Sequence, residues 1–231
     1  MTNEKKPYSS GDVSRRDFLR TSSLAVGGTV IGSLSVERGA HAASDDTIKV
    51  ALIGCGGRGT GAASQALSTE GSVRLIAMAD VFDGHLQSKL EVLQKQAKDK
   101  VDVPKDRQFI GFDAYKDAIA LADLVILTTP PGIRPIHFEE AVRQGKNIFM
   151  EKPVAVDGPG IRRVIAAAQE AKKKNLKIGV GLQRRHETPY LETIKRLHDG
   201  AIGDITSMRC YWNGSTPWVH TREDLQKQFG R

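Results

Sequence analysis

The sequence predicts an α/β fold, in which a doubly wound parallel sheet is followed by the incomplete start of an α+β second domain. Apolar runs of strand length alternate with segments of helical pattern through the middle of the chain. Repeated βα units of this kind form parallel sheets with right-handed crossovers. The runs are apolar at nearly every position, as in strands that are buried on both faces. A length of 231 residues allows one or two domains of ordinary size.

Residues 1–42 have the pattern of an export signal. Arg15 and Arg16 form a twin-arginine pair, a weakly apolar segment follows at 21–36, and Ala40-His41-Ala42 offers a small-x-small cleavage pattern. The apolar segment is too short and too polar to cross a bilayer. Because twin-arginine signals are read by bacterial export machinery, we expect a periplasmic protein with no stable membrane span. An ordinary disordered basic N-terminus is the alternative.

Composition argues against several functional classes. The net charge of +7 is not accompanied by an arginine-rich arm or an aromatic RNA-binding pattern, so we expect no nucleic-acid partner. Two cysteines are too few for a disulfide scaffold, and we expect Cys55 and Cys210 to be free thiols. The chain has no His/Cys/Asp cluster with metal-ligand spacing, so no metal is expected.

The first domain, residues 43–181, is predicted from six strands and the helices between them. The expected strands are 48–53, 73–79, 108–112, 124–129, 147–150 and 176–180. The expected helices are 61–67, 83–98, 115–120, 135–144 and 157–174. The start of the second domain, residues 182–231, is predicted to hold a helix at 189–198, a turn at 200–204, a first strand at 205–212 and a helix-like run at 223–229.

A dinucleotide site is predicted where the first strand ends. The strand is followed by Gly54-Cys55-Gly56-Gly57-Arg58-Gly59, which fits G-x-G-x-x-G. In that pattern the first glycine permits a tight turn, the second lets the backbone approach a pyrophosphate, and the third allows close helix–strand packing. The N-terminus of the next helix can then hold the phosphates. The alternative is a glycine turn that binds no nucleotide.

The position of Asp80 favours NAD as the cofactor. It ends the second strand about 20 residues after the glycine motif, where a Rossmann unit places the acid that binds the ribose hydroxyls. A carboxylate there repels the 2′-phosphate of NADP, whereas Arg58 could meet that phosphate, so NADP stays possible.

Lys152 follows the fifth strand at the same sheet edge, within Glu151-Lys152-Pro153. Its ammonium could donate a hydrogen bond to a substrate oxygen, or move a proton, during hydride transfer. By position alone a lysine at a strand end is more often a solvated surface residue, and Glu151 could be its ion-pair partner or a turn residue.

These motifs together resemble one family. They are Gly54 to Gly59, Asp80, Thr129-Pro130-Pro131, Gly145-Lys146-Asn147, Glu151-Lys152-Pro153 and Val180 to His186. Between about Ile48 and Trp212 the chain resembles the glucose–fructose oxidoreductase, inositol dehydrogenase and rhizopine-catabolism (Gfo/Idh/MocA) oxidoreductases, and the leader resembles those of exported members. The resemblance implies a sugar, cyclitol or other polyol substrate, and it makes Lys152 the expected catalytic residue.

The expected cofactor-binding residues are Gly54, Gly56, Gly57, Arg58, Gly59, Asp80, Thr129, Pro130 and Glu151. His137 lies in a helix where many family members carry a histidine, but its spacing to Gly145 is short, and we leave it out of the catalytic set.

Substrate contacts are expected where the chain leaves the sixth strand. Arg184 has a fixed fork of donors suited to vicinal hydroxyls or a carboxylate, and Gln183 stands beside it; a surface ion pair is the alternative. Tyr211 and Trp212 could stack on a sugar, although packing inside a second sheet is the stronger expectation.

Three functions remain open on the sequence. The first is an NAD(P)-dependent dehydrogenase acting on a polyol, the second an NAD-dependent glycoside hydrolase of the same family, and the third a nucleotide-binding fragment without turnover. The family resemblance implies an Asp-x-x-x-His pair in the second domain, but the one histidine after Trp212, His220, lacks such an aspartate. We therefore expect a truncated chain, whose full-length form could be a homo-oligomer.

Overall fold

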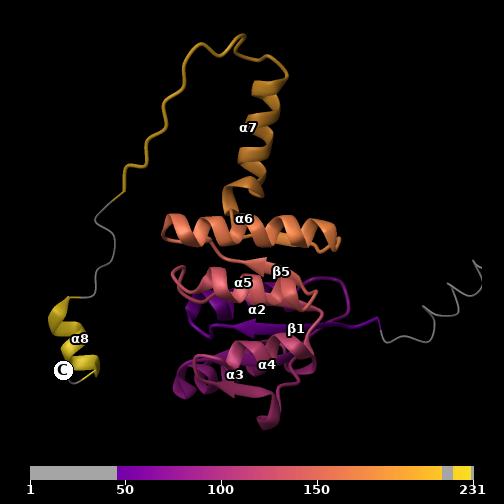
Figure 1. Ribbon diagram of the computed structural model, residues 1–231. Coiled ribbons are helices and arrows are strands. Elements are labelled where there is room, and N and C mark those ends of the chain that lie inside the picture. Colours follow the sequence, from indigo (N-terminus) through magenta and orange to yellow (C-terminus); the bar gives the residue numbers. More distant parts are fainter. Residues whose placement is uncertain (1–45, 215–220, 230–231) are drawn as a thin grey trace, which may run out of the picture. The chain divides into compact units, whose positions relative to one another are not determined.

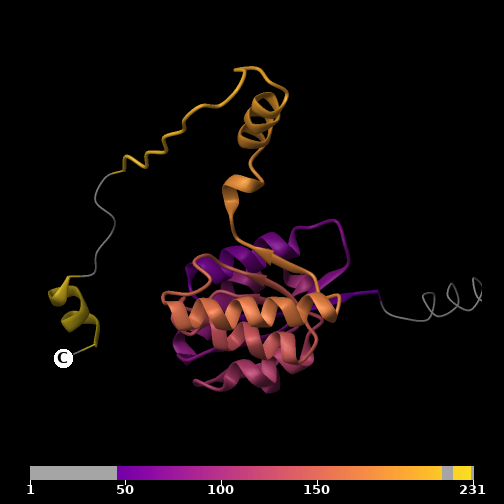
Figure 2. The ribbon, with the colours of Figure 1, turned by 45° about the horizontal axis from the view of Figure 1, so that its top comes forward.

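The computed structural model describes residues 46–214 and 221–229. The chain divides into two units, residues 1–181 and 182–231. The predicted export signal at 1–42 and His220 lie outside the described residues. Figures 1 and 2 show the ribbon in two orientations.

The first unit is built on a six-stranded parallel sheet. Its strands are β1 (Ile48–Ile53), β2 (Val73–Asp80), β3 (Gln108–Ile110), β4 (Leu124–Leu127), β5 (Asn147–Met150) and β6 (Ile178–Val180). They lie in the order β3-β2-β1-β4-β5-β6, and every pair is parallel. This order reverses direction between β1 and β4, which confirms the predicted doubly wound sheet and places its ligand crevice beyond those two strands.

Helices cover both faces of the sheet. The helices are α2 (Gly57–Leu67), α3 (Asp83–Gln96), α4 (Ala114–Leu121), α5 (Arg134–Arg143) and α6 (Gly158–Lys173). Apolar side chains of α4, α5 and α6 form one core with the sheet, and those of α2 and α3 form a second core on the other face. Burial on both faces explains why the last four residues of β1 are all buried and apolar.

Several boundaries differ from the predicted ones for local reasons. Helix α2 begins at Gly57 instead of residue 61, because Gly56 already serves as its N-cap. Strand β3 ends at Ile110, since Gly111 adopts a φ of +121°, a conformation outside the strand region. Two short 3₁₀ helices, η1 (Lys98–Lys100) and η2 (Lys105–Arg107), occupy the connection before β3 and were not predicted.

The second unit contains η3 (Gln183–Arg185), α7 (Thr188–His198) and α8 (Arg222–Phe229). The predicted strand at 205–212 is wrong, because residues 205–214 have no regular secondary structure. A strand is stable only when a neighbouring strand pairs with its backbone, and residues 182–214 and 221–229 contain no strand that could pair with this segment. Tyr211 and Trp212 are exposed, so the expected packing inside a second sheet is also wrong. No helix within the described ranges is long and apolar enough to span a membrane.

Candidate active site

The loop after β1 has the tight geometry that its glycines allow. Gly54 has a φ of +94°, and a Cβ there would lie 2.8 Å from the backbone nitrogen of Thr129. A Cβ on Gly59 would overlap the Gly54 carbonyl and lie 2.6 Å from Oγ1 of Thr128. These two glycines therefore let the loop, α2 and the end of β4 pack against one another.

Gly56 and Gly57 face open space. A Cβ on either would meet no heavy atom within 4 Å, so packing among the described residues does not explain the glycines. They form the start of α2, whose N-cap makes no side-chain hydrogen bond and whose first turn has no acidic residue. The first N–H groups of a helix lack intrahelical partners and carry partial positive charge. This open edge therefore suits the close approach of a phosphate group.

Asp80 lies against the same loop from the end of β2. Its carboxylate accepts hydrogen bonds from the backbone N–H of Cys55, at 2.6 Å, and of Phe82, at 2.9 Å. The ring nitrogen Nδ1 of His85 lies 3.8 Å from the carboxylate. Two fixed N–H donors hold the carboxylate in place, and each of its oxygens keeps a lone pair that can accept from a ribose hydroxyl.

Arg58 and Glu151 link the glycine loop to the turn after β5. Nε of Arg58 donates to Oε1 of Glu151 at 2.9 Å, and the same guanidinium donates to Gln65 at 3.1 Å. The Glu151 carboxylate lies against Gly181, where a Cβ would come within 2.7 Å of Oε1. Glu151 thus pairs with Arg58 and not with Lys152, the ion-pair partner that the sequence left open.

Lys152 follows Glu151 directly in sequence but takes no part in the contacts of Glu151 with Arg58 and Gly181. Its side chain is exposed, and its ammonium has no hydrogen-bond or ion-pair partner in the part of the chain that the structure describes. The neighbouring Glu151 is buried, at 7% exposure, and donates its N–H to Leu127 at the end of β4. The backbone at Lys152 is therefore anchored to the sheet, while its ammonium is free to meet a ligand.

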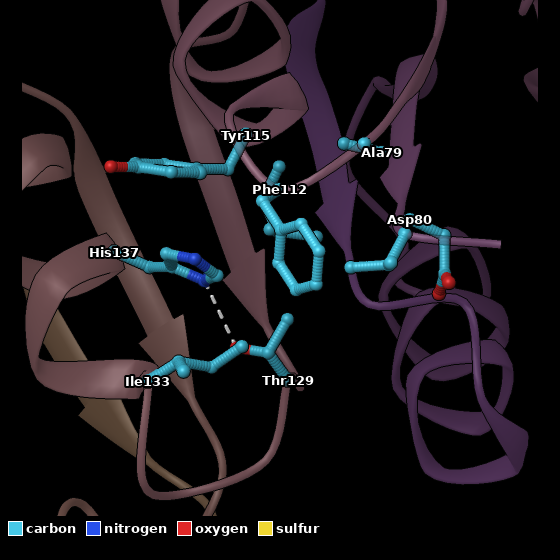
Figure 3. A pocket seen from close by; sticks show the side chains of 10 residues that line it. Ala79, Asp80, Phe112, Tyr115, Thr129, Ile133 and His137 are labelled. Atoms are coloured by element: carbon cyan, nitrogen blue, oxygen red, sulfur yellow. Dashed lines mark hydrogen bonds between the residues drawn. The ribbon is translucent and has the colours of Figure 1, made fainter.

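A small pocket of about 30 Å³ opens between the ends of β1, β2 and β4. Figure 3 shows Asp80 on one side of it and Tyr115, His137 and Thr129 on the other. Nδ1 of His137 and Oγ1 of Thr129 are 3.0 Å apart, and the imidazole stacks on the Tyr115 ring at 4.1 Å between centroids. Pro130, the next expected cofactor contact, is exposed beside Thr129.

His137 is a neutral structural group in this pocket. Burial lowers its pKa to about 4, and the positive charge of Arg134 adds to that shift. Its hydrogen bond fixes the Thr129 side chain at the edge of the crevice. This arrangement gives His137 a role in shaping the pocket, and its omission from the catalytic set stays a prediction.

Arg134 is a site residue that the sequence reasoning missed. It begins α5 and is only 3% exposed. NH1 donates to the carbonyl of Glu151, at 2.7 Å, and to that of Pro153, and NH2 donates to the carbonyl of Thr129. The signal was available, since Arg134, His137, Phe138 and Ala141 have the i, i+3, i+4, i+7 spacing of a buried helix face.

Gln183 and Arg184 belong to the second unit, which is described by itself. Arg184 donates to both carboxylate oxygens of Glu187, at 2.9 and 2.7 Å, and Gln183 donates to the same side chain. The Arg184 guanidinium also lies 5.6 Å from the Trp212 ring centre. The ion-pair alternative is therefore observed, and contact of either residue with substrate stays a prediction.

The edge fits a dinucleotide, because it combines an open helix N-terminus with a fixed carboxylate on the neighbouring strand. Within residues 46–214 and 221–229, no group of three His, Cys, Asp or Glu side chains could hold a metal ion. Both cysteines are free, Cys55 buried and Cys210 exposed.

Comparison with known proteins agrees with this geometry. Residues 48–182 match the Gfo/Idh/MocA family, described as "Oxidoreductase family, NAD-binding Rossmann fold". The chain belongs to this family. The matched region holds the glycine loop, Asp80, Arg134 and the Glu-Lys-Pro turn, so it holds every element of the sheet edge described above.

Three similar proteins show how far the relationship extends. The Bacillus subtilis protein named scyllo-inositol 2-dehydrogenase (NADP(+)) IolW is 28% identical over 77% of this chain and 45% of its own length. A Shewanella baltica glycosyl hydrolase family 109 protein is 24% identical over 90% of this chain and 46% of its own. The structure of Lactobacillus casei scyllo-inositol dehydrogenase with NAD(H) and scyllo-inositol is 26% identical, with a TM-score of 0.54 over 69% of this chain and 43% of that one. This Gfo/Idh/MocA chain thus spans less than half the length of the relatives it matches.

Proposed function

We propose that the chain supplies the nucleotide-binding part of an NAD(P)-dependent oxidoreductase that transfers a hydride between a nicotinamide cofactor and a cyclitol, sugar or similar polyol. One observation carries the proposal: the open glycine edge of α2, the Asp80 carboxylate and the unpaired Lys152 ammonium stand at the C-terminal ends of β1, β2 and β5 in one parallel sheet. In open α/β sheets this edge is where ligands bind.

Each residue has a distinct part in this proposal. The N–H groups at the start of α2, with Gly56 and Gly57 leaving room, bind the pyrophosphate, and Asp80 accepts from the ribose hydroxyls. A nicotinamide ring held at this edge would supply the hydride acceptor or donor. Nζ of Lys152 donates a hydrogen bond to the substrate oxygen, stabilises charge that develops there and can hold its proton.

NAD is the favoured cofactor in this proposal. The Asp80 carboxylate would repel a 2′-phosphate, and Arg58, which could have met one, pairs with Glu151 and Gln65. The relatives include both an NADP(+)-dependent and an NAD(H)-bound inositol dehydrogenase, so the choice is decided by measurement. Titration of the protein's fluorescence with NADH and with NADPH gives the two affinities directly.

The polyol class is supported by the scyllo-inositol dehydrogenases among the relatives. The glycosyl hydrolase family 109 protein, which matches over 90% of the chain, makes glycosidic cleavage the second candidate. Incubation with NAD, a panel of cyclitols and sugars and a chromogenic glycoside separates the outcomes. Net NADH formation supports the dehydrogenase, aglycone release without net NADH supports the hydrolase, and nucleotide binding alone indicates a binding unit without turnover. Absence of any nucleotide binding would contradict the proposal.

We also propose export by the twin-arginine route, on the strength of the Arg15-Arg16 pair and the small-x-small pattern at Ala40-His41-Ala42. In a bacterial host, the wild-type protein is expected in the periplasmic fraction with its N-terminus at Ala43. The double substitution Arg15→Lys and Arg16→Lys is expected to retain the uncleaved protein in the cytoplasm. Equal periplasmic amounts of both proteins would contradict this route.

A further inference from the structure

Arg134 is the most deeply buried cation near the expected reaction site, and its partners are unusual for a buried charge. A buried charge ordinarily faces an opposite charge, but the Arg134 guanidinium donates to three backbone carbonyls and to no carboxylate. Burial lowers the pKa of Arg134, and the nearby Glu151 carboxylate opposes that shift. Its Nε has no hydrogen-bond partner among the described residues. Every hydrogen bond that the guanidinium donates among the described residues therefore holds a backbone carbonyl.

The three carbonyls belong to two loops that are remote in sequence. Glu151 and Pro153 flank Lys152 in the turn after β5, and Thr129 lies in the turn after β4. An arginine presents its donors in a rigid planar fork. The single side chain of Arg134 therefore fixes both neighbours of Lys152 relative to the turn after β4. A lysine or a shorter side chain has no such fork.

The turn after β4, which contains Thr129, is held at a further point by helix α5. One turn along α5 from Arg134, His137 bonds to the Thr129 hydroxyl at 3.0 Å, so the carbonyl and the side chain of Thr129 are both fixed from α5. The Lys152 ammonium, in contrast, is exposed and unpaired in the described part of the chain. The backbone of Lys152 is thus constrained while its functional atom is left available.

We propose that Arg134 is a positioning residue, which directs the Lys152 ammonium to the nicotinamide end of a bound cofactor by fixing the carbonyls on both sides of it. This inference rests on the proposed nucleotide function. The hydrogen bonds of Arg134 go to the turns after β4 and β5, and none of them goes to the glycine loop or Asp80. Its loss should therefore misdirect Lys152 and leave binding of the pyrophosphate and ribose largely intact.

The test follows Lys152 itself, with the 231-residue chain and NADH as the probe. Lysines are acylated with a water-soluble N-hydroxysuccinimide ester, and mass spectrometry of the Lys152 peptide gives its modification rate with and without NADH. In the wild-type protein, NADH at about ten times its Kd is expected to slow modification about tenfold, because only the free protein leaves Lys152 open. Lys172, exposed in the last turn of α6, is the internal reference and should not be protected.

Arg134→Met is expected to bind NADH with a Kd within about fivefold of wild type, while protection of Lys152 falls below about twofold at saturating NADH. Arg134→Lys keeps a charge but not the fork, so partial protection is expected. The matched control is Arg143→Met, on the same helix, whose guanidinium pairs with Glu140 at the surface; it should behave as wild type.

The outcomes separate the two proposals. If the wild-type protein does not bind NADH, the proposed function is wrong and the positioning role falls with it. If NADH binds and Arg134→Met retains full protection of Lys152, or loses affinity and protection in equal proportion, the positioning role alone is wrong. Should Arg134→Met fail to fold, Arg134→Lys decides: partial protection at near wild-type affinity supports the role, and full protection overturns it.

Discussion

The Arg58 guanidinium donates from Nε to Oε1 of Glu151 across 2.9 Å, and this pair joins two loops that are 93 positions apart in sequence. Arg58 is half exposed, whereas the Glu151 side chain is only 10% exposed. The pair therefore holds a cation beside the glycine loop, and it neutralises the nearly buried carboxylate of Glu151.

Arg58→Met should weaken nucleotide binding more than it weakens folding. Removing the cation leaves the Glu151 carboxylate unpaired beside the phosphates, so NADH affinity is expected to fall about tenfold. Because Arg58 is half exposed and screened by solvent, its loss should lower the free energy of unfolding by no more than about 1 kcal/mol. Fluorescence titration and urea unfolding measure the two quantities, with Arg143→Met as the control. Unchanged NADH affinity would show that Arg58 does not face the cofactor.

Two glycine substitutions should affect different properties: Gly56→Ala the affinity for NADH, and Gly59→Ala the free energy of unfolding. Gly56→Ala adds a methyl group where no heavy atom lies within 4 Å, so the free energy of unfolding should change by less than about 0.5 kcal/mol. Its methyl group would stand where the pyrophosphate approaches, so NADH affinity should fall at least about tenfold. Gly59→Ala would overlap the Gly54 carbonyl and should cost more than about 2 kcal/mol by overpacking. Normal NADH binding by Gly56→Ala would place the pyrophosphate elsewhere.

Asp80→Asn should shift cofactor preference toward NADPH. The amide keeps one acceptor oxygen but loses the negative charge that repels a 2′-phosphate, and its NH₂ group would face one of the two N–H donors now bound by Asp80. The ratio of the Kd for NADPH to that for NADH should fall about tenfold. Asp83→Asn, an exposed position at the start of α3, is the control. A ratio that does not move would argue against a role of Asp80 at the ribose.

The buried imidazole of His137 should make the protein less stable in mild acid. Its pKa is 6.5 when unperturbed and about 4 in the folded protein, so below pH 6.5 the unfolded state binds a proton that the folded state resists. The free energy of unfolding should therefore decrease as pH falls from 6.5 toward 4, by roughly 3 kcal/mol in all.

His137→Phe removes this proton and is expected to flatten that part of the pH profile. At pH 7 the same variant should be about 1 kcal/mol less stable than wild type, because Thr129 loses its hydrogen bond. Urea unfolding at several pH values compares the two, with Tyr115→Phe as a control that keeps the stacked ring. Parallel profiles for wild type and His137→Phe would contradict a depressed pKa of His137.

The sheet and the glycine loop were predictable because they depend on local pattern. A continuous apolar run such as β1, followed directly by Gly54 and Gly56, specifies a buried strand and a tight turn within a dozen residues. Asp80 was found by its distance from that loop. Repeated right-handed βα units leave few arrangements of the strands, and the structure shows which of them is adopted.

The remaining features depend on contacts that the sequence pattern does not encode. The helical spacing of Arg134 with His137 indicates that Arg134 is buried, but nothing nearby in sequence shows that it reaches the carbonyls of Glu151 and Pro153. Residues 205–212 have the composition of a strand, but a strand forms only against a partner, and none pairs with them in the described part of the second unit. The β propensity of residues 205–212 suggested a strand, but without a pairing partner the segment has no regular secondary structure.

The contact between Gly181 and Glu151 has a consequence for protein engineering. Gly181 is the last residue of the first unit, and any larger side chain there would push against the carboxylate that Arg58 binds. Chimaeras that join this unit to the C-terminal part of a relative should therefore place the junction after residue 181. A junction placed earlier would import a foreign residue into the cofactor crevice, and the exchange would alter nucleotide affinity together with substrate choice.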